Sequence, residues 1–270
     1  MKRIAFSAAA LALAASALLF AGCRRAQGAD APFAIEIGGS TSVVPVLELL
    51  AAGFAADNPH IRLNVHGTGS SDGIRNAGVL YQLGMTSRDL TPSELGMGLN
   101  EQLIAIDGIA VIVRYDSPVR DLSREQIRGI YTGEITDWSE VSGEKSGAIA
   151  VITREEGSGT RGAFEEMVGF PGRLRLGAVE GPSTGAVRSN VAGNPNAIGY
   201  ISVGSVDGSV RAISVDGVEP TAENMLAGLY VIARPFILLY RDLHPASRAF
   251  LNWVISDGQA LVSRTWIPIN

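Results

Sequence analysis

The chain has 270 residues, 46% of them hydrophobic, with 22 basic side chains against 27 acidic ones. The formal net charge of −5 argues against nucleic acid as a partner, because the phosphate backbone attracts positively charged surfaces. A single cysteine excludes an intramolecular disulfide, so the folded state must depend on its hydrophobic core.

The first residues predict an exported protein. Two basic residues precede an apolar run over residues 4–20, which is the pattern of a secretory signal. The run ends in an Ala-Gly pair before Cys23, and this resembles a bacterial lipobox, although Phe20 stands where leucine is usual. We expect a lipoprotein signal peptide over residues 1–22, and lipid on Cys23 that anchors the protein in the periplasm or at the cell surface. A flexible tether follows over residues 23–32. An uncleaved N-terminal anchor is the alternative.

After the tether, short apolar runs alternate with helical patterns, which predicts an α/β fold with mostly parallel, covered strands. Ile35 and Ile37 indicate a first strand, and Leu63 and Val65 a second. Between them five apolar residues fall on one face of a predicted helix: Val43, Val46, Leu47, Leu50 and Phe54. Another helix is predicted from Ile74 onwards.

Two longer apolar runs, at residues 109–113 and 229–233, predict fully buried strands. If both strands cross between lobes, the two ends of the chain form one lobe and the middle forms the other. We therefore place lobe I at residues 33–110 and 233–270, and lobe II at residues 111–232. A single large domain would show similar runs, so periodicity leaves both arrangements open.

Three loops of glycine, serine and threonine each precede a helical pattern, at residues 39–42, 69–73 and 157–160. Glycine permits tight turns, and the first N–H groups of a helix are unpaired at the positive end of its dipole. Such loops suit a tetrahedral oxyanion, and three that converge could surround one. Serine and threonine at a helix start are also ordinary N-caps, so one loop alone carries little weight.

Arg154 strengthens the case for an anion site. It lies four residues before Ser158, and a guanidinium can give an oxyanion two parallel hydrogen bonds. The alternative is a surface ion pair with Glu155 or Glu156. We favour a combined interpretation, in which one carboxylate orients Arg154 while the guanidinium faces the ligand. Local donors of this kind can bind an anion even in a net-negative protein.

Six segments then occur along the chain in a characteristic order: 38–50, 67–74, 84–89, 129–138, 154–161 and 194–200. The segment from Tyr131 to Trp138 and the Gly-Ser-Gly-Thr loop are the most specific. In this order they resemble the phosphate-specific transport binding proteins, over almost the whole chain after Cys23. The resemblance implies a two-lobed periplasmic-binding-protein fold of type II, each lobe a mostly parallel sheet flanked by helices, with two crossover strands. Such a protein closes on dehydrated phosphate.

The resemblance also implies which residues bind phosphate. They are Ser40, Thr41, Ser42, Ser70 and Ser71 on one lobe, and Arg154, Ser158, Gly159 and Thr160 on the other. Some members of the family carry a further aspartate, which accepts the proton of hydrogen phosphate and so rejects sulfate. Here Ser87 occupies that position, followed by Arg88, as in one branch of the family. We expect both to touch the ligand, Ser87 as a weak acceptor; the alternative for Arg88 is a partner for Glu94.

Other functions have less support. A serine hydrolase needs a base near its serine, and His60, His66 and His244 lie outside any triad pattern. Metal ligands at suitable spacing are also missing from the sequence, so we predict neither an enzyme nor a cofactor. The same fold could bind sulfate, molybdate or tungstate, or serve as a phosphate sensor lipoprotein. The favoured prediction is a monomer that delivers inorganic phosphate to the permease and ATPase subunits of an ABC transporter.

Overall fold

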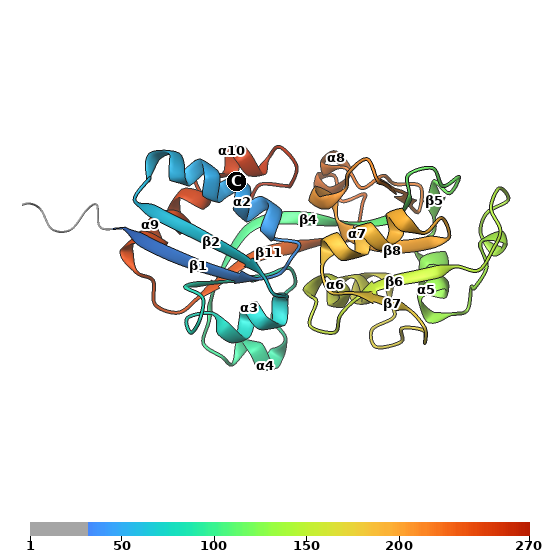
Figure 1. The fold of residues 1–270 in the computed structure, drawn as a ribbon, viewed down its shortest axis with the longest axis horizontal. Coiled ribbons are helices and arrows are strands. Elements are labelled where there is room, and N and C mark those ends of the chain that lie inside the picture. Colours follow the sequence, from blue (N-terminus) through green and yellow to red (C-terminus); the bar gives the residue numbers. More distant parts are fainter. Residues whose placement is uncertain (1–31) are drawn as a thin grey trace, which may run out of the picture. The chain divides into compact units, whose positions relative to one another are not determined.

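In the computed structural model, which describes residues 32–270, nine strands form one sheet in the order β2-β1-β3-β11-β4-β8-β6-β7, with β9 beside β4 (Figure 1). The predicted signal peptide, Cys23 and all but the last residue of the tether lie outside the described residues. The strands of this sheet are β1 (Phe33–Gly39), β2 (Ile61–Gly67), β3 (Leu83–Thr86), β4 (Asn100–Arg114), β6 (Ala150–Arg154), β7 (Val179–Gly181), β8 (Ala197–Ser202), β9 (Val210–Ala212) and β11 (Ala233–Tyr240). A small second sheet pairs β5 (Asp121–Leu122) with β10 (Ser214–Val215).

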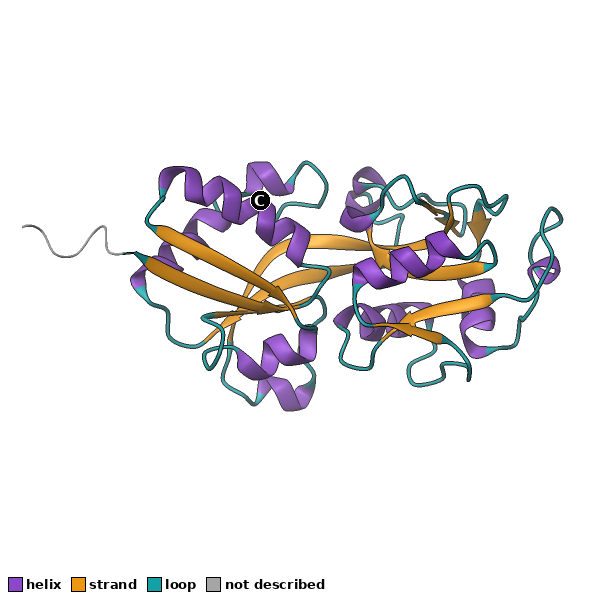
Figure 2. Ribbon diagram, viewed as in Figure 1, coloured by secondary structure: helices purple, strands orange, loops and turns teal. Residues whose placement is uncertain are grey.

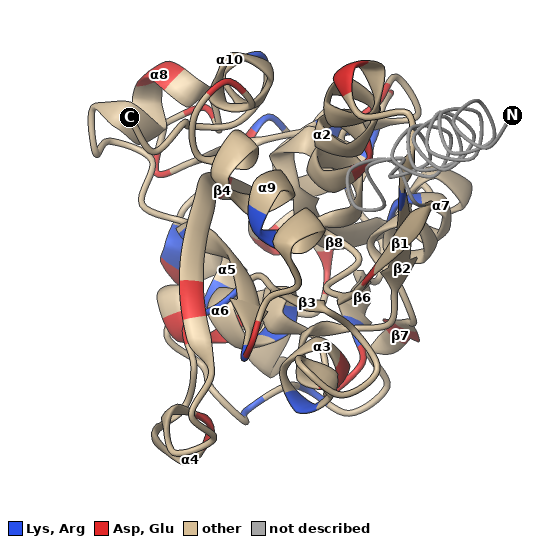
Figure 3. Ribbon diagram, turned by 90° about the vertical axis from the view of Figure 1, so that its left-hand side faces the viewer, with Lys and Arg blue, Asp and Glu red and all other residues tan. Residues whose placement is uncertain are grey.

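Helices cover this sheet (Figure 2). They are α2 (Val44–Asp57), α3 (Ser70–Asn76), α4 (Pro92–Leu95), α5 (Arg124–Thr132), α6 (Gly159–Val168), α7 (Thr184–Gly193), α8 (Ala222–Leu226), α9 (Pro245–Val254) and α10 (Gln259–Val262). None of the helices within residues 32–270 combines the length and the apolar character that crossing a membrane requires. Basic and acidic residues are interspersed over these elements in the view of Figure 3, in keeping with the small net charge.

Strands β4 and β11 run side by side between two lobes (Figure 1). Lobe I contains β1 to β3 with α2, α3, α4, α9 and α10, and lobe II contains β5 to β10 with α5 to α8. The first part of β4 pairs with β11, whereas its last residues pair with β8 and β9. The predicted α/β fold of type II is therefore confirmed. The residue boundaries given above for the two lobes stay a prediction.

The sheet is more mixed in direction than the sequence predicted. β1 is parallel to β3, and β6 is parallel to both β7 and β8. The two crossover strands break this pattern, because β11 is antiparallel to β3 and to β4, and β4 is antiparallel to β8. The mostly parallel character therefore holds away from the crossover, while the connection between lobes is antiparallel.

Two predicted elements were misplaced. The run at residues 229–233 is not a buried strand, since Leu229 and Val231 are 59% and 50% exposed and β11 begins only at Ala233. Gly228, with a φ of 68°, turns the chain after α8, and only alternate residues then face the core. The helix predicted from Ile74 begins instead at Ser70 and ends at Asn76. This shift places the serines of the second loop in the first turn of α3.

The core explains why some of the characteristic segments are so specific. In lobe II, Tyr131 and Trp138 are fully buried, and Phe164 stacks on Tyr200 with ring centroids 4.0 Å apart. The indole of Trp138 donates to the carbonyl oxygen of Asn196 at 3.0 Å, which joins two of those segments directly. The aromatic residues of these segments therefore pack in the core of lobe II, and this packing supports the loops that follow.

Candidate functional site

The loops that carry the predicted site follow the carboxyl ends of strands. Serine and threonine side chains come directly after β1, β2 and β3 and one residue further on after β7, and Arg154 is the last residue of β6. Open α/β sheets bind ligands at this edge. Gly39 shows how tightly the first loop turns, because its φ is 141° and a Cβ there would lie 2.1 Å from the carbonyl oxygen of Met85. Only glycine fits this position.

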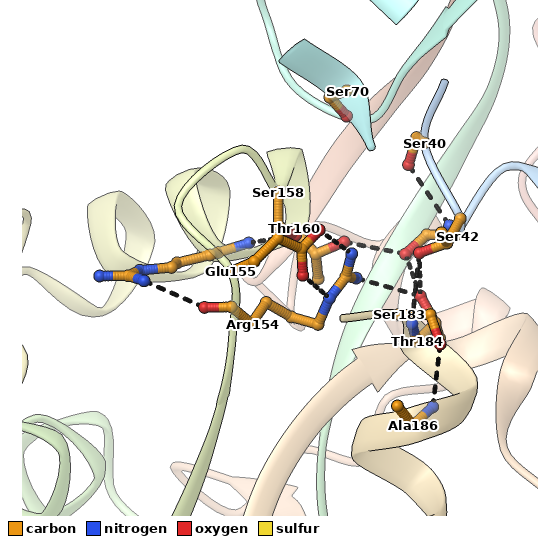
Figure 4. Close-up of polar contacts among 12 residues, drawn as sticks. Ser40, Ser42, Ser70, Arg154, Glu155, Ser158, Thr160, Ser183, Thr184 and Ala186 are labelled. Atoms are coloured by element: carbon orange, nitrogen blue, oxygen red, sulfur yellow. Dashed lines mark hydrogen bonds and ion pairs between the residues drawn. The ribbon is translucent and has the colours of Figure 1, made fainter. Parts of the chain in front are cut away.

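Hydroxyl groups from both lobes meet in one cluster (Figure 4). The Ser42 Oγ lies 2.8 Å from the Thr160 Oγ1 and 2.8 Å from the Thr184 Oγ1. The Thr41 Oγ1 lies 3.1 Å from the Thr184 Oγ1 and accepts a hydrogen bond from the Thr184 N–H at 3.2 Å. Thr41 and Ser42 belong to lobe I and the other two to lobe II, so these contacts join the lobes.

A second group of hydroxyls lies next to the first. The Ser40 hydroxyl donates to the Ser87 Oγ at 2.8 Å, and the Ser70 Oγ accepts from the Ser87 N–H at 3.3 Å. All three serines are buried. Gly159 of lobe II approaches them so closely that a Cβ there would lie 2.3 Å from the Ser70 Oγ. The backbone at the start of α6 therefore reaches into the serine cluster.

Arg154 is buried, with 2% of its surface exposed. Its Nε and Nη2 donate to the two carboxylate oxygens of Glu155 at 2.8 and 2.7 Å, and its Nη1 donates to the Thr184 Oγ1 at 3.2 Å. The surface ion pair considered from the sequence is therefore wrong, although Glu155 is indeed the partner. One edge of the guanidinium is fixed by the carboxylate, and the other points at the hydroxyls.

Three predicted site residues lie at the edge of this cluster or turn away from it. Ser158 caps α6, because its Oγ accepts from the Arg161 N–H at 3.3 Å. Ser71 joins the lobes through its backbone, whose N–H donates to the Gly157 carbonyl at 3.1 Å. Arg88 makes the alternative contact, a bidentate pair with Glu94 at 2.7 and 2.8 Å. Its role as a ligand contact stays a prediction that these contacts do not support.

Sequence reasoning missed Thr184 and its neighbour Ser183. Ser183 caps α7 by accepting from the Ala186 N–H at 3.1 Å, and Thr184 is the first residue of that helix. A signal was present, because residues 183–185 read Ser-Thr-Gly at the start of a helix, and the recognised loops are likewise made of glycine, serine and threonine at helix starts.

A buried ion pair was also missed. Arg234 of β11 and Asp107 of β4 are register partners, and both side chains are 0% exposed at a separation of 3.1 Å. Burial raises the pKa of Asp107 to about 6, although its contacts with Arg234 and Ser202 favour the ionised form. Burial likewise lowers the pKa of Arg234 to about 10, against the opposing effect of Asp107. Arg234 Nη1 donates to the Ser87 Oγ at 3.1 Å, so the pair adjoins the site.

The arrangement suits the capture of an oxyanion. Hydroxyls, helix-start N–H groups and a buried guanidinium are hydrogen-bond donors, and a charged acceptor strengthens each such bond. The described residues contain no group of three or more His, Cys, Asp or Glu side chains that could hold a metal ion.

Comparison with known proteins places this site in a family. The model of the PBP superfamily domain matches residues 25–258. The chain is also 30% identical over 204 residues to the phosphate-binding protein PstS of Bacillus subtilis (strain 168), covering 73% of this chain and 67% of that protein. The chain belongs to the PstS-type phosphate-binding proteins. A second PstS relative, from Borreliella burgdorferi, is 27% identical over 243 residues, and the match covers 84% of this chain and 87% of that protein.

Solved structures agree with the PstS-type assignment. A Clostridium perfringens protein, described as a phosphate ABC transporter substrate-binding protein with bound phosphate, is 42% identical with a TM-score of 0.84. The match covers 88% of this chain and 100% of that one. An ABC-type phosphate transport receptor from Vibrio cholerae is 34% identical with a TM-score of 0.69, over 87% of this chain and 99% of the receptor.

Proposed function

We propose that this chain binds inorganic phosphate between its two lobes and delivers it to the permease and ATPase subunits of an ABC-type importer. The observation that carries the proposal is the convergence of buried Arg154 with hydroxyls of both lobes at the carboxyl ends of the strands. Relatives that are named for phosphate binding support the choice of anion. The bound phosphate is released unchanged, because the proposed role is capture and not catalysis.

Each part of the site has a distinct task in this proposal. Arg154 supplies the positive charge, and Glu155 holds the guanidinium in place so that little conformational freedom is lost on binding. Ser42, Thr160 and Thr184 supply hydroxyl donors to oxygens of the tetrahedral ion. The site is screened from water once the lobes close, which strengthens every charge-assisted hydrogen bond in it.

Binding proceeds in two steps. Phosphate first meets the lobe I hydroxyls of Thr41, Ser42 and Ser70, and closure then brings Arg154 and the first turn of α6 over the ion. The short contacts of Ser42 with Thr160 and Thr184 belong to the closed arrangement. Closure presents a surface composed of both lobes to the transporter.

Export and anchoring complete the proposal. A leader over residues 1–22 directs the chain across the membrane, and lipid on Cys23 retains it there as a monomer in the periplasm or at the cell surface. The tether then gives the folded lobes reach toward the transporter.

Calorimetric titration of the exported chain with phosphate tests the assignment of the site. Changing Arg154 to Ala should weaken binding by about 2 to 5 kcal/mol, the scale for removing one partner of a buried charged pair. Arg124→Ala is a matched control, because this arginine pairs with Asp216 at the surface of lobe II. Equal affinity of the wild type and the Arg154 variant would contradict the assignment. Tighter binding of sulfate, molybdate or tungstate than of phosphate would replace phosphate as the proposed cargo.

A further inference from the structure

The buried pair of Asp107 and Arg234 adjoins the proposed site without belonging to it. Each residue sits on one of the two strands that cross between the lobes, and the two are directly opposite in register. A buried ion pair is weak support for stability, because desolvation of two charges offsets much of their attraction. The contacts of the pair indicate a role other than stability.

Those contacts fix the guanidinium of Arg234 in one orientation. Its Nε and Nη2 donate to the Asp107 Oδ2 at 3.3 and 3.1 Å, and the Asp107 Oδ1 accepts from the Ser202 hydroxyl at 2.7 Å. The remaining nitrogen, Nη1, donates to the carbonyl oxygen of Ser87 at 3.3 Å and to the Ser87 Oγ at 3.1 Å. Arg234 thus links the crossover strands to a hydroxyl of the site.

The direction of the hydrogen bonds at Ser87 follows from this link. A serine oxygen accepts through two lone pairs and donates one proton. Arginine can only donate, so one lone pair is taken by Arg234; the Ser40 hydroxyl donates to the other at 2.8 Å. The proton of Ser87 is then left for a neighbouring acceptor, and the Ser70 Oγ is 3.4 Å away. Ser87 therefore faces the site as a donor, contrary to the weak acceptor expected from the sequence.

We propose that Arg234, held by Asp107, is a positioning residue that fixes Ser87 as a hydrogen-bond donor and thereby makes the site prefer the doubly charged form of phosphate. The inference rests on the proposed function and deepens it. A hydroxyl donor forms a good hydrogen bond to a deprotonated phosphate oxygen. With a protonated phosphate oxygen, the proton of the ligand and the proton of the hydroxyl would point at each other. An acceptor at this position, such as aspartate, would favour the protonated form.

The other charged groups around the site do not supply the missing acceptor. Glu155 directs both of its oxygens at the guanidinium of Arg154, and Arg88 donates to Glu94. Tyr200 has its pKa raised to about 12 by burial, so its phenol stays protonated. Asp107 directs its oxygens at Arg234 and Ser202.

Calorimetry with phosphate at about pH 6.5 and about pH 8.5, on either side of the second ionisation of the ligand, tests the inference. The contact with Arg234 at 3.1 Å favours the ionised form of Asp107 in both conditions. The wild type should bind several-fold more tightly at the higher pH. The double variant Asp107→Leu with Arg234→Met removes the two charges together, which avoids leaving one of them buried and unpaired. Ser87 is then free to turn, and the two affinities should become similar.

Ser87→Asp provides an independent measurement if the double variant does not fold. An acceptor now faces the ligand, and the pH preference should reverse toward tighter binding at the lower pH. A wild-type pH preference in either folded variant would overturn the role of Arg234, as would tighter wild-type binding at the lower pH. A wild type that fails to bind phosphate at both pH values would instead refute the proposed function. The two failures are therefore distinguishable.

Discussion

At Gly159 the backbone of lobe II comes into contact with the serines of lobe I. A Cβ at this residue would lie 2.3 Å from the Ser70 Oγ and 2.9 Å from the Ser87 Oγ. Glycine is therefore required here by space, since Gly159 has no unusual φ that other residues would avoid. The position decides how closely the first turn of α6 can approach the ligand.

Gly159→Ala should weaken phosphate binding by about tenfold or more, because a displacement near 1 Å disturbs several hydrogen bonds at once. The free energy of unfolding should change little in the open form, since alanine favours a helix. Isothermal titration combined with chemical denaturation separates the two effects. Gly143→Ala is the control, because a Cβ there meets no atom within 4 Å. Normal affinity of the Gly159 variant would show that the lobes do not approach as described.

The residues that the sequence identified and those that it missed differ in their chemical context. Thr41 and Ser42 stand in a loop with glycine, and Arg154 ends the strand that leads into another such loop, where a polar side chain has few roles other than capping or binding. Arg234 stands within an apolar strand, and its partner Asp107 is 127 residues away along the chain. Pairing of two buried charges depends on the register of β4 with β11, which no local pattern specifies. The hydroxyl direction at Ser87 depends in turn on that pair.

At the scale of elements, α4 is held to the loop after β3 by one ion pair. Glu94 and Thr91 form the capping box of α4. The Glu94 carboxylate also accepts hydrogen bonds from both terminal nitrogens of Arg88. The hydrogen bond from Arg88 lowers the pKa of Glu94 from 4.5 to about 2. The ionised carboxylate therefore stabilises the folded state at pH values above about 4.5, and this contribution is lost as the pH falls toward about 2.

Glu94→Gln keeps the capping geometry and removes the charge. The variant should be less stable than the wild type at neutral pH, and the difference should shrink as the pH falls from about 4.5 to about 2. Urea denaturation at a series of pH values measures this difference. Glu125→Gln, which alters an exposed pair with Arg128, should show no comparable effect, because solvent screens such pairs. A constant difference for Glu94→Gln over the whole range would contradict the ionic contribution.

Elements with strong local signals were predicted well. All five apolar residues of the predicted α2 face are buried, and Pro45 lies in the first turn of that helix. The start of α3 was missed because Ser70 and Ser71 are weak helix formers, and their placement depends on Gly73 packing against the backbone of Gly38 and Met85. The segment at 229–233 was mistaken for a fully buried strand because composition does not show that alternate residues are exposed. In both cases tertiary contacts overrode the local pattern.

At the scale of the whole molecule, the crossover strands make the lobes dependent on each other. β4 pairs with β11 in its first part and with β8 in its last part. Asp107 of β4 accepts a hydrogen bond from the Ser202 hydroxyl of β8, and its partner Arg234 of β11 donates to Ser87, which follows β3. Residues Ala34–Asn270 accordingly form one compact unit. Both lobes bury residues of these strands in their cores, for example Leu239 in lobe I and Val111 in lobe II, so each core depends on the strands.

Thermal unfolding should therefore occur in a single transition, and phosphate should raise its midpoint as a whole. With free phosphate at about 100 times Kd, binding to the folded state alone adds about 2.7 kcal/mol to the free energy of unfolding. Differential scanning calorimetry with and without phosphate measures both properties, and Arg154→Ala at the same phosphate concentration is the control for specific binding. Two separate transitions, of which phosphate moves only one, would show that the lobes unfold independently despite the strands they share. The shared strands require a single transition. The interlobe site requires that phosphate raise the midpoint of this transition in the wild type and barely change it in the Arg154 variant.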